Sequence, residues 1–241
     1  MESIRVTKDN LNLFAFTNGA ALKGRVRLAY LSFHGLGYCG METELKAGDV
    51  EDGAAGVLRI FPYYGPWSWM NREAVRLTDG IVAAAFERYG LPEGFPVVST
   101  GGSMGGCSAL IYARYARVAP VAVAADCPVC DLPFHATERP DLPRTMYNAF
   151  AHYECGIDEA MRRHSPLHQT ADMPDIPYFI DHGDADTAVN KSLHSDRFVA
   201  EMRKAGRNVE YLEIPGMKHC DLNSAPAAAK RFGEFVRGFA R

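Results

Sequence analysis

The sequence has no segment that resembles a membrane span or an export signal. No run approaches the ~18 uninterrupted apolar residues that a helix needs to cross a bilayer. Residues 1–8 are mostly charged and polar and contain no apolar core of the kind that export signals have. These absences predict a cytoplasmic protein that has no membrane as a partner.

The chain also lacks a large excess of charge of either sign. The chain has 26 basic and 29 acidic residues, a net charge of −3, and its basic residues are dispersed. This balance argues against a partner such as nucleic acid or an anionic membrane. With 241 residues, of which 47% are hydrophobic, the chain suits one well-buried α/β domain better than two. We therefore predict a single domain over residues 1–241, whose oligomeric state the sequence does not indicate.

A recognisable metal-ligand motif is missing as well. The six cysteines are even in number, but without an export signal they are expected to be reduced thiols. Cys127 and Cys130 form one C-x-x-C without a second ligand pair, which favours buried structural thiols over a zinc or redox site. Four histidines of one segment also lack metal-ligand spacing and are expected to pack or to lie at the surface: His135, His152, His164 and His168. No metal or organic cofactor is predicted.

Apolar segments of strand length alternate with segments of helical spacing along most of the chain. The predicted strands cover residues 25–33, 56–61, 118–125, 176–183 and 209–214, together with a run that starts at Val97. The predicted helices cover residues 71–89, 108–116, 190–205 and 226–240, and a run near residues 11–16 is a candidate edge strand. This alternation predicts an α/β fold with a mostly parallel sheet and helices on both faces.

Residues 127–172 break this rhythm. They mix prolines with acidic and basic residues and contain short helical stretches around residues 144–153 and 158–164. An insertion between two late strands is a common place for a small cap. We predict a cap insertion here and expect it to select the substrate.

One serine lies among glycines where the run from Val97 gives way to a helix. Gly101 and Gly105 flank Ser103 in the pattern G-x-S-x-G, and a sharp turn there would expose the serine hydroxyl. The following helix would point its N–H groups at a developing oxyanion, with the N–H of Met104 as the first donor. A chain with 22 glycines can also produce this pattern in an ordinary loop. The strand before Ser103 and the helix after it favour a nucleophile.

Two further loops are candidates for the same site. The strand 25–33 runs into His-Gly-Leu-Gly, a setting for a second oxyanion donor, which would be the N–H of Leu36 with Gly37 as its neighbour. A tight turn that requires glycine would explain this pattern equally well. The loop 63–70 holds both tryptophans, and Tyr64, Trp67 and Trp69 are predicted to line the substrate pocket, although aromatic clusters often belong to a core.

A serine nucleophile requires a histidine base, which in turn requires a carboxylate. His219 follows the last predicted strand, and Asp186 follows the strand before it. The carboxyl ends of parallel strands share one edge of a sheet, so both side chains should lie near Ser103. Asp184 and Asp126 are the alternative acids.

Three motifs resemble the α/β-hydrolase superfamily and, within it, the prolyl-oligopeptidase-like and related esterase branch. G-G-S-x-G-G matches residues 101–106, H-G-x-x-D-x-x-V matches residues 182–189, and G-x-x-H matches residues 216–219. The resemblance implies an α/β-hydrolase fold and a serine hydrolase with Ser103 as nucleophile, Asp186 as acid and His219 as base.

The resemblance says less about the substrate. Full prolyl-oligopeptidase relatives carry a large N-terminal propeller that filters peptides, and 241 residues leave no room for one. We therefore expect an esterase that cleaves a small-molecule or carbohydrate ester through an acyl-enzyme. A peptidase or amidase with the same triad is the alternative, followed by a noncatalytic binding module.

Overall fold

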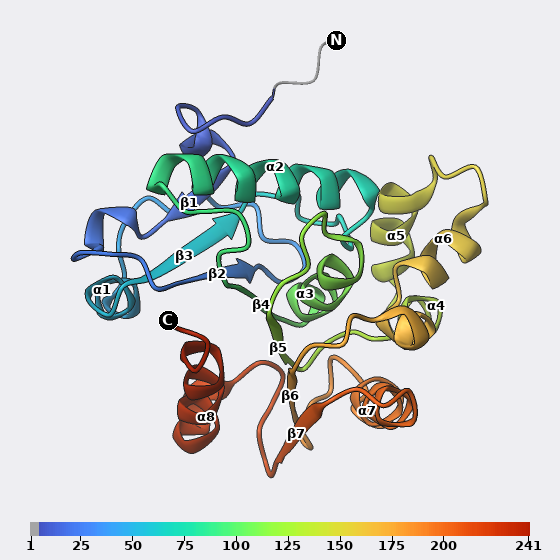
Figure 1. The fold of residues 1–241 in the computed structure, drawn as a ribbon. Coiled ribbons are helices and arrows are strands. Elements are labelled where there is room, and N and C mark those ends of the chain that lie inside the picture. The colour runs from blue at the N-terminus through green and yellow to red at the C-terminus, as the bar shows by residue number, and fades with distance from the viewer. Residues whose placement is uncertain (1–4) are drawn as a thin grey trace.

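A seven-stranded sheet forms the centre of the molecule (Figure 1). The computed structural model describes residues 5–241. The strand order is β1-β3-β2-β4-β5-β6-β7, and all neighbouring strands are parallel except β1, which pairs antiparallel with β3 at one edge. The strands are β1 (Ala15–Thr17), β2 (Leu28–Phe33), β3 (Val57–Pro62), β4 (Val97–Gly102), β5 (Ala122–Asp126), β6 (Tyr178–Gly183) and β7 (Val209–Ile214). The mostly parallel sheet predicted from the sequence is confirmed.

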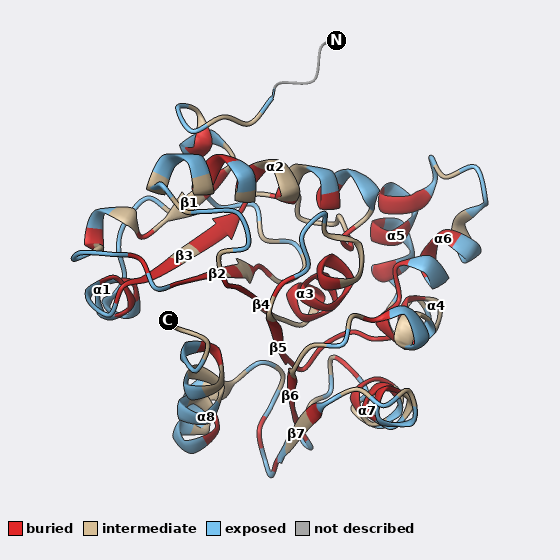
Figure 2. Cartoon of the chain, in the orientation of Figure 1, coloured by how far each residue is buried: buried red, intermediate tan, exposed pale blue. Residues whose placement is uncertain are grey.

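Helices cover both faces of this sheet. The helices are α1 (Ala47–Ala54), α2 (Arg72–Tyr89), α3 (Met104–Tyr115), α4 (Leu132–His135), α5 (Leu142–Phe150), α6 (Ile157–Arg163), α7 (Ser195–Lys204) and α8 (Pro226–Arg237). The apolar side chains of α2, α3 and α7 join the larger core on one face, and α8 packs against the smaller core on the other. Figure 2 shows that α3 is almost wholly buried, whereas α2 and α8 each keep an exposed side.

Two residues define the ends of α2. The side chain of Asn71 accepts a hydrogen bond from the N–H of Ala74 at 3.0 Å, which caps the first turn. Gly90 follows the last residue with a φ of 63°, the left-handed conformation that glycine adopts without steric cost. These two residues confirm the predicted helix 71–89 to within one residue.

Four elements differ from the prediction. The candidate edge strand near residues 11–16 is a 3-10 turn over Leu11–Leu13, followed by the short strand β1. The strand expected over residues 118–125 begins only at Ala122, because Pro120 has no N–H for a strand ladder. The helix expected from Asn190 begins at Ser195, since the Asn190 side chain accepts hydrogen bonds from Ser192 and Leu193 and forms a turn instead. Helix α1 was not predicted, because its hydrophobic side is short and two buried aspartates interrupt it.

The predicted cap, residues 127–172, contains α4, α5, α6 and a 3-10 run, Pro166–Asp172. It attaches to the loop between β3 and α2. The indole Nε1 of Trp69 donates to Thr145 Oγ1 at 3.0 Å, and His164 Nδ1 lies 2.8 Å from the carbonyl oxygen of Met70. The segment is therefore tied to the body of the molecule next to α2 and α3.

No helix within residues 5–241 combines the length and the apolar character needed to cross a membrane. The predicted absence of an export signal concerns in part residues 1–4, which lie outside the described residues.

Candidate active site

Ser103 lies on the sharp turn between β4 and α3. Its φ of 59° is unusual for any residue other than glycine, and its N–H donates to the carbonyl oxygen of Asp126 at 2.9 Å. A Cβ atom on Gly105 would lie 2.2 Å from the carbonyl oxygen of Phe33, and one on Gly101 would lie 2.4 Å from that of Gly105. Only glycine fits at these two positions, so the motif has the steric meaning that the sequence predicts.

His219 and Asp186 are hydrogen-bonded partners on neighbouring loops. His219 Nδ1 lies 2.7 Å from Asp186 Oδ2. The same carboxylate oxygen lies 3.0 Å from His182 Nε2, and Asp186 Oδ1 accepts the N–H groups of Ala188 and Val189 at 2.8 and 3.0 Å. Every oxygen of the buried carboxylate is therefore engaged, and its orientation toward His219 is fixed.

These contacts shift both pKa values toward the charged forms. Burial alone would raise the pKa of Asp186, but hydrogen bonds from His182 and His219 hold it well below its usual range. Burial alone would lower the pKa of His219, but Asp186 and the sulfur of Cys127 raise it to about 9. The site thus stabilises the imidazolium that would form when His219 accepts a proton.

The alternative acids are engaged elsewhere. The carboxylate of Asp184 accepts the N–H of Gly216 at 2.6 Å. Asp126 is buried beside Asp181, and its burial raises its pKa to about 7, opposite to what the partner of a catalytic base requires. Asp186 is the carboxylate that contacts His219.

A close approach of two loops places the acid beside the base. A Cβ atom on Gly183 would lie 2.0 Å from the carbonyl oxygen of Met217, and the N–H of Ala185 donates to that oxygen at 3.2 Å. The loop after β6 and the loop after β7 are therefore in direct backbone contact.

Ser103 and His219 line one cavity of about 450 Å³ at the carboxyl edge of the sheet. The lining consists of Gly35, Leu36, Trp69, Gly102, Ser103, His135, Arg139, Val189, His219 and Cys220. Among the hydrogen bonds of residues 5–241, none joins Ser103 Oγ to His219. Such bonds commonly tighten only when substrate binds, so the shared cavity is the relevant observation.

Two backbone N–H groups near Ser103 are free, one on Leu36 in the cavity lining and one on Met104, which follows Ser103. Within the described chain, neither Leu36 nor Met104 donates its N–H to an acceptor, whereas the N–H of Gly37 donates to the carbonyl oxygen of Pro66 at 2.9 Å. Leu36 and Met104 remain available to an oxyanion, and Gly37 does not.

The comparison with protein families agrees with this geometry. The model of the prolyl oligopeptidase family matches residues 82–238, which carry Ser103, Asp186 and His219. The chain belongs to the prolyl oligopeptidase family. Its fold is the α/β-hydrolase fold that the resemblance implied. No curated protein sequence matches the chain.

Solved structures share the fold at low sequence identity. Pyrococcus horikoshii acylaminoacyl peptidase aligns with a TM-score of 0.73 and 13% identity over 90% of this chain and 37% of its own. A puromycin-hydrolyzing peptidase of Mycobacterium tuberculosis aligns with a TM-score of 0.65 and 20% identity over 90% of this chain and 33% of its own. Esterase B of Lactobacillus rhamnosis aligns with a TM-score of 0.66 and 16% identity over 90% of this chain and 78% of its own. The chain thus spans about a third of the length of the two peptidases and most of the length of the esterase.

The aromatic loop of this prolyl oligopeptidase family member only partly lines the cavity. Trp69 is in the lining, with its indole fixed by Thr145. Tyr64 is not: it is buried, and its hydroxyl donates to the carbonyl oxygen of His34 at 2.8 Å. Trp67 is also outside the lining and lies under the guanidinium of Arg144, at 5.7 Å from the ring centre. The predicted pocket contacts of Tyr64, Trp67 and Gly37 are corrected to packing and backbone roles.

Six lining residues were not predicted: Gly35, Gly102, His135, Arg139, Val189 and Cys220. His135 and Arg139 reach the cavity from the segment between β5 and β6. His135 was expected to be a packing or surface histidine, and no sequence motif marks it. The one indication in the sequence was that His135 lies in residues 127–172, the segment predicted to select the substrate.

His135 belongs to a buried cluster that spacing in the sequence does not show. His135 Nδ1 contacts Glu138 Oε2 at 2.5 Å, and His194 Nε2 lies 2.9 Å from the same oxygen. Burial alone would raise the pKa of Glu138, but the two imidazoles lower it to about 2. His194 Nδ1 accepts the N–H groups of Cys130 and Asp131 at 3.0 and 3.2 Å, so Nε2 carries the proton and donates to Glu138.

This arrangement does not suit a metal ion. A histidine that binds a metal donates its other ring N–H to an acceptor. In His194 the other nitrogen faces two N–H donors, so a metal on Nε2 would require an imidazolate. The cluster is a hydrogen-bonded support for His135.

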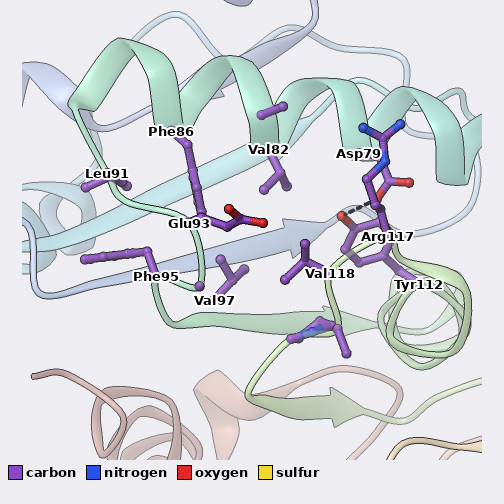
Figure 3. Close-up of a pocket in the computed structure, with 14 residues that line it drawn as sticks. Asp79, Val82, Phe86, Leu91, Glu93, Phe95, Val97, Tyr112, Arg117 and Val118 are labelled. Carbon is purple, nitrogen blue, oxygen red and sulfur yellow. Dashed lines mark hydrogen bonds between the residues drawn. The ribbon is translucent and has the colours of Figure 1, made fainter.

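A second cavity of about 290 Å³ lies between α2 and the loops that precede β4 and β5. Figure 3 shows Val82, Phe86 and Phe95 facing it, with Tyr112 hydrogen-bonded to Asp79 at one end. It opens near the amino end of β4, whereas Ser103 follows the carboxyl end. Neither serine nor histidine is among its lining residues.

Proposed function

We propose that this protein is a serine esterase that cleaves carboxylic esters through an acyl-enzyme. The observation that carries the proposal is the 2.7 Å contact between His219 Nδ1 and Asp186, which leaves His219 Nε2 as a proton acceptor at the cavity that Ser103 lines. A hydroxyl, a base and a fixed carboxylate in this order are the requirements of acyl transfer.

In the proposed reaction Ser103 Oγ attacks the ester carbonyl while His219 Nε2 takes the serine proton. The N–H groups of Leu36 and Met104 receive the oxyanion, which their unpaired state permits. His219 then gives the proton to the leaving alcohol, and water cleaves the acyl-enzyme by the same route. Asp186 stays ionised and holds the imidazole in one tautomer.

His135 supplies a polar contact for the substrate. Its Nδ1 faces Glu138, which leaves Nε2 as a hydrogen-bond acceptor in the wall of the cavity. A substrate with hydroxyl groups, such as a carbohydrate ester, could donate to this nitrogen. Trp69 supplies an apolar wall to the same cavity.

The alternative is a peptidase or amidase with the same three residues. Family membership favours it, and two of the similar structures are peptidases. The similarity over most of the length of esterase B supports the esterase. Neither observation fixes the leaving group, because ester and amide cleavage use the same triad.

A substrate panel tests the proposal. Purified protein is assayed with nitrophenyl esters of increasing acyl length, acetylated sugars, feruloyl esters and aminoacyl anilides. We expect ester turnover that exceeds anilide turnover at least tenfold. Turnover confined to the anilides would replace the esterase with the peptidase.

A covalent probe tests whether the site is catalytic at all. A fluorophosphonate should label the wild type and the variant Ser224→Ala, which changes an exposed serine, but not Ser103→Ala. Absence of labelling in folded wild-type protein would support a noncatalytic binding module.

A further inference from the structure

Two cysteine sulfurs lie close to His219, the base of the proposed triad. The sulfurs of Cys127 and Cys220 and a ring nitrogen of His219 all lie within 4.8 Å of one another. Cys220 Sγ is 3.8 Å from His219 Nε2. Cys127 directly follows β5, and the other two residues follow β7, so three positions from two strand ends converge at one point.

The backbone of both cysteines is strained. Cys127 has a φ of 44° and Cys220 a φ of 50°, a region that residues with a Cβ atom seldom occupy. Strained residues persist where the surrounding structure holds them, and they cluster at functional sites. Here the strained conformations belong to the two residues whose sulfurs reach the imidazole.

The set has the composition of a zinc site. Two thiolates and one imidazole are ligands of catalytic and structural zinc, and tetrahedral coordination places such ligand atoms roughly 3.5–3.8 Å apart. The 3.8 Å between Cys220 Sγ and His219 Nε2 fits this spacing.

The second ring nitrogen of His219 also suits a metal. His219 Nδ1 contacts the carboxylate of Asp186, the partner that metal-binding histidines usually have, and Nε2 offers its lone pair to a metal once its proton is lost. His194 shows the opposite arrangement, with its Nδ1 lone pair used by two backbone N–H groups. This difference favours the cysteine set over the His135, Glu138 and His194 set.

The site is open to an entering ion. His219 and Cys220 line the cavity that Ser103 also lines, whereas Cys127 is buried behind them. Three protein ligands leave the fourth position of a tetrahedral ion directed away from them, for water.

We propose that Cys127, His219 and Cys220 form a Zn²⁺ site that reversibly inhibits the enzyme. Binding displaces the protons that the two sulfurs and His219 Nε2 carry, which pass to solvent, and the metal then occupies Nε2. An imidazole that binds Zn²⁺ through Nε2 cannot take the proton of Ser103. The inhibition rests on the proposed function, whereas the binding does not.

Co²⁺ is the probe for binding, because its thiolate complexes absorb in the near ultraviolet and its tetrahedral complexes absorb in the visible. Metal-free, reduced wild-type protein should bind one Co²⁺ with both absorptions, and Zn²⁺ should displace it. Cys220→Ser and, separately, Cys127→Ser should weaken Co²⁺ binding at least about tenfold and reduce the thiolate absorption. Cys39→Ser and Cys155→Ser, which change two exposed thiols, should bind Co²⁺ as the wild type does.

The variants' thermal unfolding shows whether they fold. If buried Cys127→Ser does not fold, Cys220→Ser alone decides the question, because Cys220 is exposed. Unchanged Co²⁺ spectra in folded Cys220→Ser, or no thiolate absorption in the wild type, would overturn the site.

Inhibition is measured with the best ester or amide substrate of the panel. Zn²⁺ should abolish wild-type turnover at the concentration that displaces Co²⁺, and a chelator should restore it. Any activity that Cys220→Ser retains should need at least about tenfold more Zn²⁺ for half-inhibition. Full activity with Zn²⁺ bound would overturn the inhibition. A wild type that hydrolyses nothing but gives the Co²⁺ spectrum would refute the proposed function and leave the metal site standing.

Discussion

Two buried clusters combine histidine with a carboxylate, and they differ in what the remaining ring nitrogen contacts. In the first, His219 is held by Asp186 through Nδ1, and its Nε2 lies at the cavity. In the second, His194 is held by Glu138 through Nε2, and its Nδ1 accepts two backbone N–H groups. The same residue types therefore give one imidazole with a usable lone pair and one without.

The comparison teaches that the partner of the second nitrogen decides what a histidine can do. His219 can take up a proton or bind a metal because Asp186 occupies the other side of the ring. His194 has no free nitrogen and can only hold Glu138 and the chain around Cys130 in place. Substitutions in the first cluster should therefore affect turnover, and those in the second should affect stability.

The largest effect is expected from Ser103→Ala, which removes the nucleophile that the first cluster serves. Turnover should fall on the order of 10⁴- to 10⁶-fold, whereas thermal unfolding should change little because Ser103 is partly exposed. Steady-state kinetics and calorimetry measure the two quantities. Retention of more than a tenth of the wild-type turnover would mean that another residue is the nucleophile.

Asp186→Asn should have the next largest effect, because an amide can hold His219 in the wrong tautomer. Turnover should fall about 10³- to 10⁴-fold. Asp184→Asn is the matched control, since an amide oxygen can still accept the N–H of Gly216, and its turnover should stay within a few-fold of the wild type. Similar losses in both variants would show that the loop as a whole, rather than the carboxylate on His219, matters.

Glu138→Gln tests the second cluster. One oxygen of Glu138 accepts from both His135 and His194 and the other accepts the N–H of Asn190, so an amide NH₂ must face a donor in either orientation. The free energy of unfolding should fall by about 2–3 kcal/mol, and denaturant titration measures it.

The pH dependence of this loss follows from the pKa of Glu138, which is lowered from 4.5 to about 2. The stabilisation is complete above pH 4.5 and disappears as the pH falls toward 2. The difference in free energy of unfolding between the wild type and Glu138→Gln should therefore become smaller below pH 4.5. The control Glu201→Gln, on an exposed ion pair, should change stability by less than about 0.5 kcal/mol. A difference in free energy of unfolding that does not change with pH would contradict this account.

Asp181→Asn should have the smallest effect, in the opposite direction. Asp181 is fully buried behind the first cluster, and within the described chain its carboxyl oxygens have no hydrogen-bond partner. Burial and the charge of Asp126 raise its pKa to about 10. Because the unfolded chain ionises near pH 4, this group costs the wild type stability as the pH rises from about 4 toward 10.

The neutral amide avoids that cost. Asp181→Asn should raise the free energy of unfolding by about 1–2 kcal/mol at pH 8, or Tm by roughly 2–8 °C, and by less at pH 5. Calorimetry at the two pH values tests this, with Asp175→Asn as an exposed control. A lower Tm at pH 8 would show that the ionised carboxylate is needed.

The sequence predicts features that depend on neighbouring residues and misses those made by distant ones. The glycines around Ser103 and the helical spacing of α2 are local features, and the structure confirms both. The contact of His219 with Asp186 could be expected because both residues lie in loops that follow neighbouring parallel strands. The cluster of His135, Glu138 and His194 joins α4 to the turn before α7, and no spacing in the sequence indicates it.

The loop 63–70 shows a second limit. Its tryptophans are two residues apart, yet one lines the cavity and the other lies under Arg144. Which of them faces the cavity depends on the left-handed backbone at Trp69 and Met70. Neither residue is a glycine, so the sequence gives no sign of this conformation. The conformation is fixed by contacts with α5 and the segment after α6, as the hydrogen bonds of Trp69 and Met70 show.

The absence of a side chain at Gly183 lets the turn that bears Asp186 rest on the turn that bears His219. Two loops packed backbone to backbone cannot easily slide past each other. We therefore expect the two turns to keep their positions relative to each other if the cavity widens. The hydrogen bond between His219 and Asp186 would then survive a change in the width of the cavity.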